Sequence, residues 1–389
     1  LVIIGLAVFF YGLVPIAGAF YSRRNWRYFR RRFNELGQKP ILDSAACMNA
    51  EAGSSAGEWK DFRFSGGFES LTGDKILWIR SETLTIPVDL KGAKTYVLPD
   101  TAAQGIPEDF DPGEEAPEQI RLDRISALTG GVKVFVGGSL CLREGRRIFA
   151  STARPLMVIF YEGPDRSLTV RTIRAGRHRN EFFNFITPYS FVAGAFSEII
   201  MALSLYSRPV YRLALSSAII ALFTPIFPWL PPGIFFTFAY RRLWWKARIF
   251  RAYRDLVRLP RAYIPAGEHQ GRLPGGEIYV EKQYDTLPEA FYEQKIPFII
   301  PAGEKRKGDT WRLFGVLAGG DEKKPDALPA EPGDAFAVYG ALPGAIEPLA
   351  RRYTRKAYAM EVISWLLLLT GIGINVFFIA AILSLFRIS

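Results

Sequence analysis

Cysteine and histidine are scarce in this sequence. Among 389 residues there are two cysteines, Cys47 and Cys141, and two histidines, His178 and His269. So small a set predicts neither a disulfide framework nor a structural zinc site. A phosphate-binding G-x-x-x-x-G-K-[ST] loop and an H-E-x-x-H zinc motif are also missing. We therefore expect no metal and no cofactor, and we identify no catalytic residue.

Charge is nearly absent from four long stretches. They are residues 1–20, 186–206, 213–240 and 358–386. Twenty helical residues rise about 30 Å, which matches the hydrocarbon core of a bilayer. We predict a membrane protein with about four transmembrane helices.

The first apolar run lies at the start of the sequence. The sequence begins with Leu, so we expect that the true start is missing. Ala17-Gly18-Ala19 also resembles a signal-peptidase site, which leaves a cleaved leader as an alternative. An Arg cluster directly after residue 20 favours a membrane anchor.

The third apolar run contains four prolines, Pro225, Pro228, Pro231 and Pro232. Proline removes a backbone donor and kinks a helix. We predict that this run is broken or re-entrant near its middle. A membrane tolerates such a break only where protein covers the freed carbonyl groups.

Basic residues gather at one end of each apolar run. Residues 21–40 hold seven Lys or Arg, residues 171–181 hold four, residues 241–262 hold eight and residues 347–357 hold four. With four spans, all of these clusters fall on one side, which the positive-inside rule places in the cytoplasm. The net charge of +11 therefore indicates a membrane surface and not nucleic acid. We predict a multi-pass protein of the bacterial inner membrane with cytoplasmic soluble regions.

Two of the basic clusters have helical amphipathic spacing, residues 21–38 and 241–259. We expect both helices to lie on the inner leaflet, with aromatic side chains in the lipid and Arg on anionic headgroups. We favour ordinary positive-inside anchoring without lipid selectivity over specific lipid binding. The residues assigned to this surface are Arg23, Arg24, Trp26, Arg27, Arg241, Arg242, Trp244, Trp245 and Lys246.

Two soluble regions lie between the apolar runs. Residues 39–184 contain short β-branched and aromatic segments bounded by Gly, Pro and Asp, including 75–80, 83–89, 133–137, 156–161 and 167–173. This pattern predicts a small all-β barrel or sandwich. Residues 99–118 form an acidic, Pro-rich insertion without the regular spacing of a calcium loop. Residues 260–356 predict a second, smaller β domain.

The first soluble region resembles a known family. Residues 76–99, ILWIRSETLTIPVDLKGAKTYVLP, followed by residues 131–140, GVKVFVGGSL, are similar to the GIDE-type domain found between membrane helices. That family includes membrane-anchored ubiquitin ligases with a C-terminal RING zinc module. This sequence has no RING module, so the resemblance implies a β domain and carries over neither ligase activity nor any functional residue.

Two polar residues stand inside apolar runs, Glu198 in 186–206 and Asn375 in 358–386. An acid at that depth is costly and needs a partner or a proton. Glu198 is interpreted either as a relay for protons or cations or as a structural hydrogen-bonding group. We expect the structural role, with Asn375, Ser216, Ser217 or Thr224 as its partner.

These observations favour a non-catalytic membrane scaffold or adaptor whose cytoplasmic β domains bind a protein partner. A transport or channel component built on Glu198 and the broken third helix is one alternative. A membrane enzyme acting on lipid or peptide is another.

Overall fold

The computed structural model describes residues 2–49, 60–73, 75–98, 118–119, 125, 131–143, 145–175, 177, 182–207, 209–265, 267–317 and 328–385. The chain divides into two compact units. The helical unit comprises residues 1–27, 179–251 and 353–389. The β unit comprises residues 28–178 and 252–352, so both predicted soluble regions contribute to one unit.

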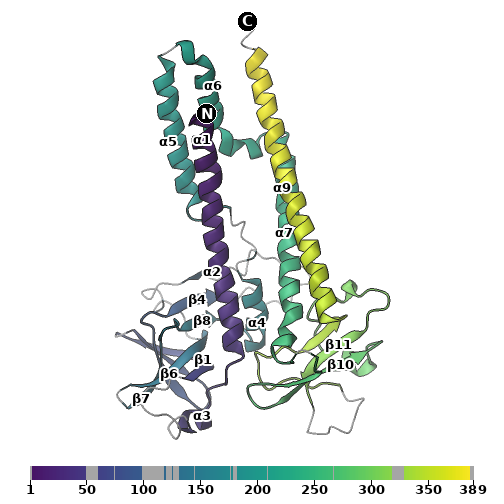
Figure 1. The fold of residues 1–389 in the computed structure, drawn as a ribbon. Coiled ribbons are helices and arrows are strands. Elements are labelled where there is room, and N and C mark those ends of the chain that lie inside the picture. The colour runs from purple at the N-terminus through teal and green to yellow at the C-terminus, as the bar shows by residue number, and fades with distance from the viewer. Residues whose placement is uncertain are drawn as a thin grey trace. The chain divides into compact units, whose positions relative to one another are not determined.

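The helical unit is built from the apolar runs (Figure 1). Its elements are α1 (Val2–Val8), the π-helix η1 (Phe9–Leu13), α2 (Val14–Gly37), α5 (Thr187–Tyr206), η3 (Pro209–Tyr211), α6 (Arg212–Leu222), η4 (Thr224–Trp229), α7 (Gly233–Arg258) and α9 (Ile346–Leu385). Helices α2, α7 and α9 each have one end in the β unit. Among the described residues, three helical stretches are long and apolar enough to cross a membrane: Val2–Gly37, Thr187–Tyr206 and Ile346–Ile382.

The third apolar run is broken at its prolines. Helix α6 ends at Leu222, a short 3-10 segment follows, and α7 begins at Gly233. The carbonyl groups freed by the break are covered by protein. The side-chain amide of Asn375 donates to the carbonyls of Phe227 (2.6 Å) and Leu230 (2.9 Å), and the hydroxyl of Thr237 donates to that of Pro228 (2.6 Å).

The first β region forms a closed ring of five strands. The strands are β1 (Lys60–Thr72), β2 (Ile76–Arg80), β3 (Thr85–Asp89), β6 (Lys133–Arg143) and β7 (Arg146–Ala150). Antiparallel pairing joins β1 to β2, β2 to β3, β7 to β6 and β6 to β1, and a parallel bridge between Val88 and Phe149 closes the ring. Strands β8 (Met157–Tyr161), β4 (Lys94–Leu98) and β5 (Glu118–Gln119) extend the sheet from β6.

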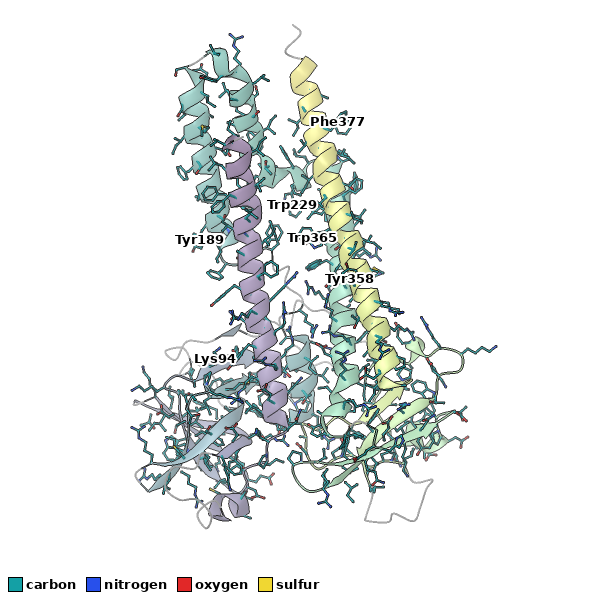
Figure 2. The ribbon with its side chains drawn as sticks, viewed as in Figure 1. Lys94, Tyr189, Trp229, Tyr358, Trp365 and Phe377 are labelled. Atoms are coloured by element: carbon teal, nitrogen blue, oxygen red, sulfur yellow. The ribbon has the colours of Figure 1, made fainter. Side chains whose placement is uncertain are left out.

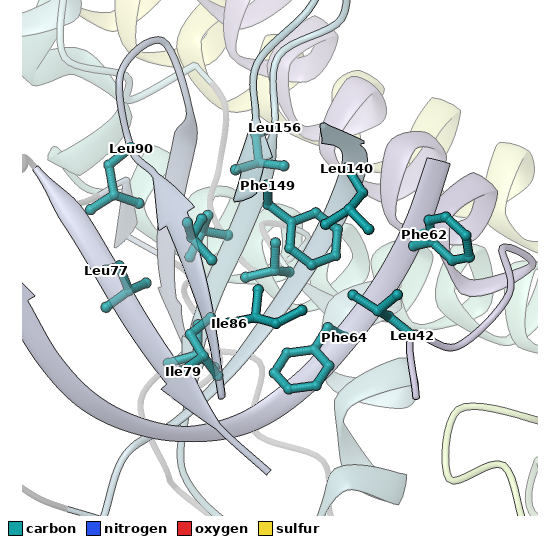
Figure 3. Packing of buried hydrophobic residues seen from close by; sticks show 14 of the residues in the cluster. Leu42, Phe62, Phe64, Leu77, Ile79, Ile86, Leu90, Leu140, Phe149 and Leu156 are labelled. Carbon is teal, nitrogen blue, oxygen red and sulfur yellow. The ribbon is translucent and has the colours of Figure 1, made fainter. Parts of the chain in front are cut away.

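Apolar side chains, which alternate with polar ones along the strands, fill the barrel. Leu77, Ile79, Ile86 and Phe149 point inward (Figure 3), and these four residues and Val88 are at most 2% exposed. Such alternation is what a sheet with one buried face requires. The barrel predicted for this region is therefore present. The short helix α3 (Ser44–Asn49) lies before it.

One strand predicted for the first soluble region is wrong, and residues 297–300, predicted as a strand of the second region, form only an isolated bridge between Phe298 and Ala341. Residues 167–173 belong to helix α4 (Asp165–Arg174), which follows Pro164 and has an acid in its first turn. The segment SLTVRTI fits a two-residue period, but Leu168, Thr169, Thr172 and Ile173 also share one helical face, and all four are buried. Packing against that buried face therefore selects a helix over a strand for residues 167–173.

The second β region is a four-stranded antiparallel sheet in the order β12-β11-β10-β9. Its elements are η5 (Leu259–Ala262), β9 (Gln270–Arg272), β10 (Ile278–Tyr284), α8 (Glu289–Glu293), η6 (Ala302–Glu304), β11 (Trp311–Val316) and β12 (Gly340–Pro343). Phe291, Ile296, Trp311 and Leu313 form its core.

The amphipathic face of residues 21–38 does not face lipid at its C-terminal end. Phe29 packs on Tyr96 of β4 (ring centroids 4.5 Å apart), and Phe33 packs on Phe135 of β6 (5.1 Å). Leu36 lies so close to Gly137 that a Cβ there would be 2.7 Å from its Cδ1. The expectation that this whole face enters the membrane is therefore wrong from Phe29 onward, because the barrel covers it.

Candidate functional site

An aromatic and cationic cluster joins α2, α7 and α9 within the helical unit. The ring of Trp244 is 5% exposed and lies below two guanidinium groups, those of Arg248 (4.3 Å from the ring centroid) and Arg23 (5.7 Å). Trp365 meets it edge to face at 6.1 Å, and Tyr240 lies 5.8 Å away. Guanidinium groups over an indole ring are attracted by its electron-rich face. We call these residues the Trp244 cluster.

An ion pair fixes the charged side of this cluster. Nε of Arg251 donates to Oε1 of Glu361 (2.6 Å), and the guanidinium of Arg248 lies 3.9 Å from the same oxygen. With Arg23, three positive charges stand against the one negative charge of Glu361. Three guanidinium groups and one carboxylate thus stand together next to apolar helices.

A cavity of about 300 Å³ opens at this cluster. Tyr358 and Trp365 stand on α9 at this level (Figure 2). Its lining consists of Arg23, Trp244, Tyr358, Glu361, Val362, Trp365, Leu366 and Leu369. The lining thus passes from charged to apolar along α9.

The residues assigned to the membrane surface have different environments. Arg24, Arg27, Arg241, Arg242 and Lys246 are exposed, and Trp26 and Trp245 are half-buried. Of the nine, the structure brings Arg23 and Trp244 together at the cavity. Arg241 lies 5.2 Å from the ring centroid of Trp229. Glu361 and Trp365 lie far along the chain from Trp244, so the sequence does not show that they join this cluster, whereas Tyr240 lies one helical turn before Trp244 on α7.

Glu198 is fully buried, and neither of its carboxyl oxygens has a hydrogen-bond partner among the described residues. The hydroxyl of Tyr11, 7% exposed, also lacks one there. Tyr11 belongs to η1, which packs on α5: Ser190 donates to the carbonyl of Phe10 (2.5 Å), and a Cβ at Gly194 would lie 2.7 Å from the Tyr11 ring. π-Helical turns are frequent at functional sites.

The partners expected for Glu198 are engaged elsewhere. Asn375 donates to the broken segment, and the hydroxyls of Ser216, Ser217 and Thr224 donate to carbonyls four residues earlier in the chain. The expected hydrogen bond from Glu198 to any of these four is therefore wrong.

In the β unit, the most deeply buried ion pair joins the two β regions. The two terminal guanidinium nitrogens of Arg63 on β1 donate to the carboxylate of Asp334, and the two side chains are 1% and 2% exposed. The guanidinium lies 5.2 Å from the ring centroid of Phe336, which packs on Phe135 of the barrel. A bidentate pair of this kind fixes both distance and orientation. The two residues are 271 positions apart, so sequence reasoning had no signal for the pair.

Asp255, which lines a cavity of about 210 Å³ in the same unit, belongs to a second ion pair. Arg177 binds Asp255, whose other oxygen accepts from Nε of Arg254 (2.6 Å). Burial opposes ionisation of Asp255, but the charges of Arg177 and Arg254 and their hydrogen bonds outweigh it and lower the pKa of Asp255. Its carboxylate therefore stays ionised and paired at neutral pH.

Exposed aromatic side chains are few on the described surface of the β unit. Among its large exposed hydrophobic residues, Tyr292 (63%) and Phe298 (37%) are the aromatic ones. Both rings pack against the buried Phe291, with centroids 5.2 Å away in each case. They form an aromatic patch beside the core of the second sheet.

Within the part of the chain that the structure describes, no group of three or more His, Cys, Asp or Glu could hold a metal ion. His178 and almost all of the acidic insertion 99–118 lie outside the described residues. So does a short G-x-S-x-G spacing at Gly53 to Gly57, which sequence reasoning overlooked.

Comparison with protein-family models, with curated proteins and with solved structures gives no match to this chain. The resemblance to the GIDE-type domain thus rests on residues 76–99 and 131–140 alone, and no residue role is taken from it.

Proposed function

We propose that this chain is a membrane-embedded adaptor that presents its β unit to a protein partner in the bacterial cytoplasm. The observation that carries the proposal is the aromatic patch of Tyr292 and Phe298. Exposed Tyr and Phe anchored on a rigid core are typical of the central contacts of protein interfaces.

The helical unit supports the membrane placement. Three helical stretches have the length and composition of membrane spans. The helix pair α6 and α7, broken at its prolines and capped by Asn375, supplies a fourth passage. Phe196 of α5, Phe235 of α7 and Phe377 of α9 are more than 60% exposed, as lipid-facing residues would be. With four passages, the basic clusters lie together on the cytoplasmic side.

Thiol labelling tests this topology. In a cysteine-free background, Tyr206→Cys at the end of α5 should react with an impermeant thiol reagent in intact cells, and Glu82→Cys in the turn between β2 and β3 should not. Both positions are exposed. Labelling of Glu82→Cys from outside would place the β unit on the wrong side and end the proposal.

Crosslinking tests the adaptor role. A photoreactive amino acid at Tyr292 should give a discrete crosslinked protein in cells, and the adduct should disappear when Phe298 is changed to Ser. Leu142, 66% exposed on β6, is the matched control position. Equal crosslinking from positions 142 and 292 would contradict a specific interface.

One observation favours a second candidate function, a transport component that moves protons or cations. The carboxyl of Glu198 and the hydroxyl of Tyr11 are buried without partners among the described residues. An ionised carboxylate without a partner is costly to bury, so this site needs a proton or a cation taken from outside.

A further inference from the structure

The cavity at the Trp244 cluster has two chemically different ends. At one end stand Arg23 and Glu361, and the guanidinium groups of Arg248 and Arg251 lie close by. An anionic group is the ligand that such an end attracts.

The other end of the cavity is apolar and open to the side of α9. Leu366 and Leu369 are each 59% exposed, and Val362 is 40% exposed. They follow Glu361 along one helix, so the apolar lining begins within one helical turn of the charged end. A ligand that fills this cavity must itself have an anionic part joined to a hydrocarbon part.

A third observation points to a ligand at the boundary between the two ends. The side chain of Trp244 is 95% buried and lines the cavity, yet its indole N–H has no hydrogen-bond acceptor among the described residues. A buried donor without an acceptor is rare and costs about 1–3 kcal/mol. An acceptor oxygen of a bound molecule would satisfy it.

We infer that this cavity binds one anionic phospholipid, with its phosphate between Arg23 and the N–H of Trp244 and an acyl chain along Val362, Leu366 and Leu369. The inference rests on the membrane placement proposed above. Trp and Tyr concentrate where lipid headgroups meet hydrocarbon, and Tyr240, Trp244, Tyr358 and Trp365 gather at this level of the helical unit. Such a lipid-binding site is more specific than a general attraction of basic residues to the inner leaflet.

Native mass spectrometry of the full chain in mild detergent tests the inference. The probes are phosphatidylglycerol and phosphatidylcholine with the same acyl chains. We expect one phosphatidylglycerol to be retained in preference. Arg23→Gln should reduce its retention about tenfold, as expected for loss of one charge-assisted contact. Arg24→Gln, the matched control, removes the same charge from an exposed neighbour and should change retention less than about twofold.

Trp244→Phe gives an independent readout, because it keeps the ring below Arg248 and removes the N–H. Retention of phosphatidylglycerol should fall while the melting temperature stays within a few degrees of the wild-type value. If Trp244→Phe does not melt cooperatively, Leu369→Gln takes its place in this test. That substitution alters only the exposed, apolar end of the cavity.

Three results would overturn the inference. Equal losses in the Arg23 and Arg24 variants would reduce it to general surface electrostatics. Displacement of the lipid by sodium phosphate would make the site one for a free anion. Failure of the chain to float with phosphatidylcholine vesicles would instead refute the membrane placement itself, which distinguishes that failure from loss of the lipid-binding site alone.

Discussion

Two buried carboxyl groups of this protein have opposite surroundings. Asp334 in the β unit meets both nitrogens of the Arg63 guanidinium, whereas Glu198 in the helical unit has no hydrogen-bond partner among the described residues. Asp334 is part of a fixed pair that orients two β regions. Glu198 has no such pair among the described residues. Burial alone therefore does not determine the role of an acid. Its hydrogen-bond partner does.

The largest effect is expected from breaking the Arg63 pair. Asp334→Ala leaves a guanidinium buried without its carboxylate, which costs about 3–5 kcal/mol. The thermal melt of the full chain in detergent should shift strongly downward, and Asp285→Ala, an exposed acid in the same unit, should leave it unchanged. The double change Arg63→Met with Asp334→Leu should recover most of the loss, since no unpaired charge remains. A melt unaffected by Asp334→Ala would show that the pair is not what joins the two β regions.

A smaller effect is expected at the break between α6 and α7. Asn375→Leu leaves the carbonyls of Phe227 and Leu230 without their donor, at a cost of about 1–3 kcal/mol. The melting temperature of the detergent-solubilised chain should fall. Phe377→Leu, two residues along α9 and 69% exposed, serves as the control and should have little effect. If both variants melt alike, the amide does not stabilise the break.

The Arg177–Asp255 pair predicts a response to acid. The pKa of Asp255 is lowered below its unfolded value of about 4, so the pair stabilises the fold above that pH. The stabilisation is lost as the pH falls through the lower, folded value. Melting temperatures measured from neutral pH down to pH 3 should therefore fall less steeply for Asp255→Asn than for the wild type. Parallel curves would mean that Asp255 titrates alike in the folded and unfolded chains.

The smallest effect on stability is expected at Glu198. Glu198 has no hydrogen-bond partner among the described residues, so its replacement leaves no such partner unpaired. The free energies of unfolding of Glu198→Gln and Glu198→Leu should therefore lie within about 1.5 kcal/mol of the wild-type value, as they do for conservative core changes. Function separates the candidates: rescue of a deletion strain by both variants excludes transport through Glu198. A folded Gln variant without rescue would favour the transport component over the adaptor.

Local pattern determined several features of this protein. The apolar runs, their basic flanks and the prolines of residues 225–232 act through hydropathy and backbone chemistry, and these are properties of each segment by itself. They predicted the long apolar helices and the break between Leu222 and Gly233. The strands of the barrel were likewise visible as short alternating segments bounded by turn residues.

Tertiary structure decided what each exposed or buried face meets. The face of Phe29, Phe33 and Leu36 has the same amphipathic spacing whether lipid or a barrel covers it, and only the fold assigns it to the barrel. Residues 167–173 satisfy both a strand and a helix period, and burial of one helical face selects α4. Arg63 with Asp334, and Arg23 with Trp244, come from segments hundreds of residues apart. The sequence shows which side chains are polar, but long-range packing determines which partners they meet. The candidate sites depend on that packing.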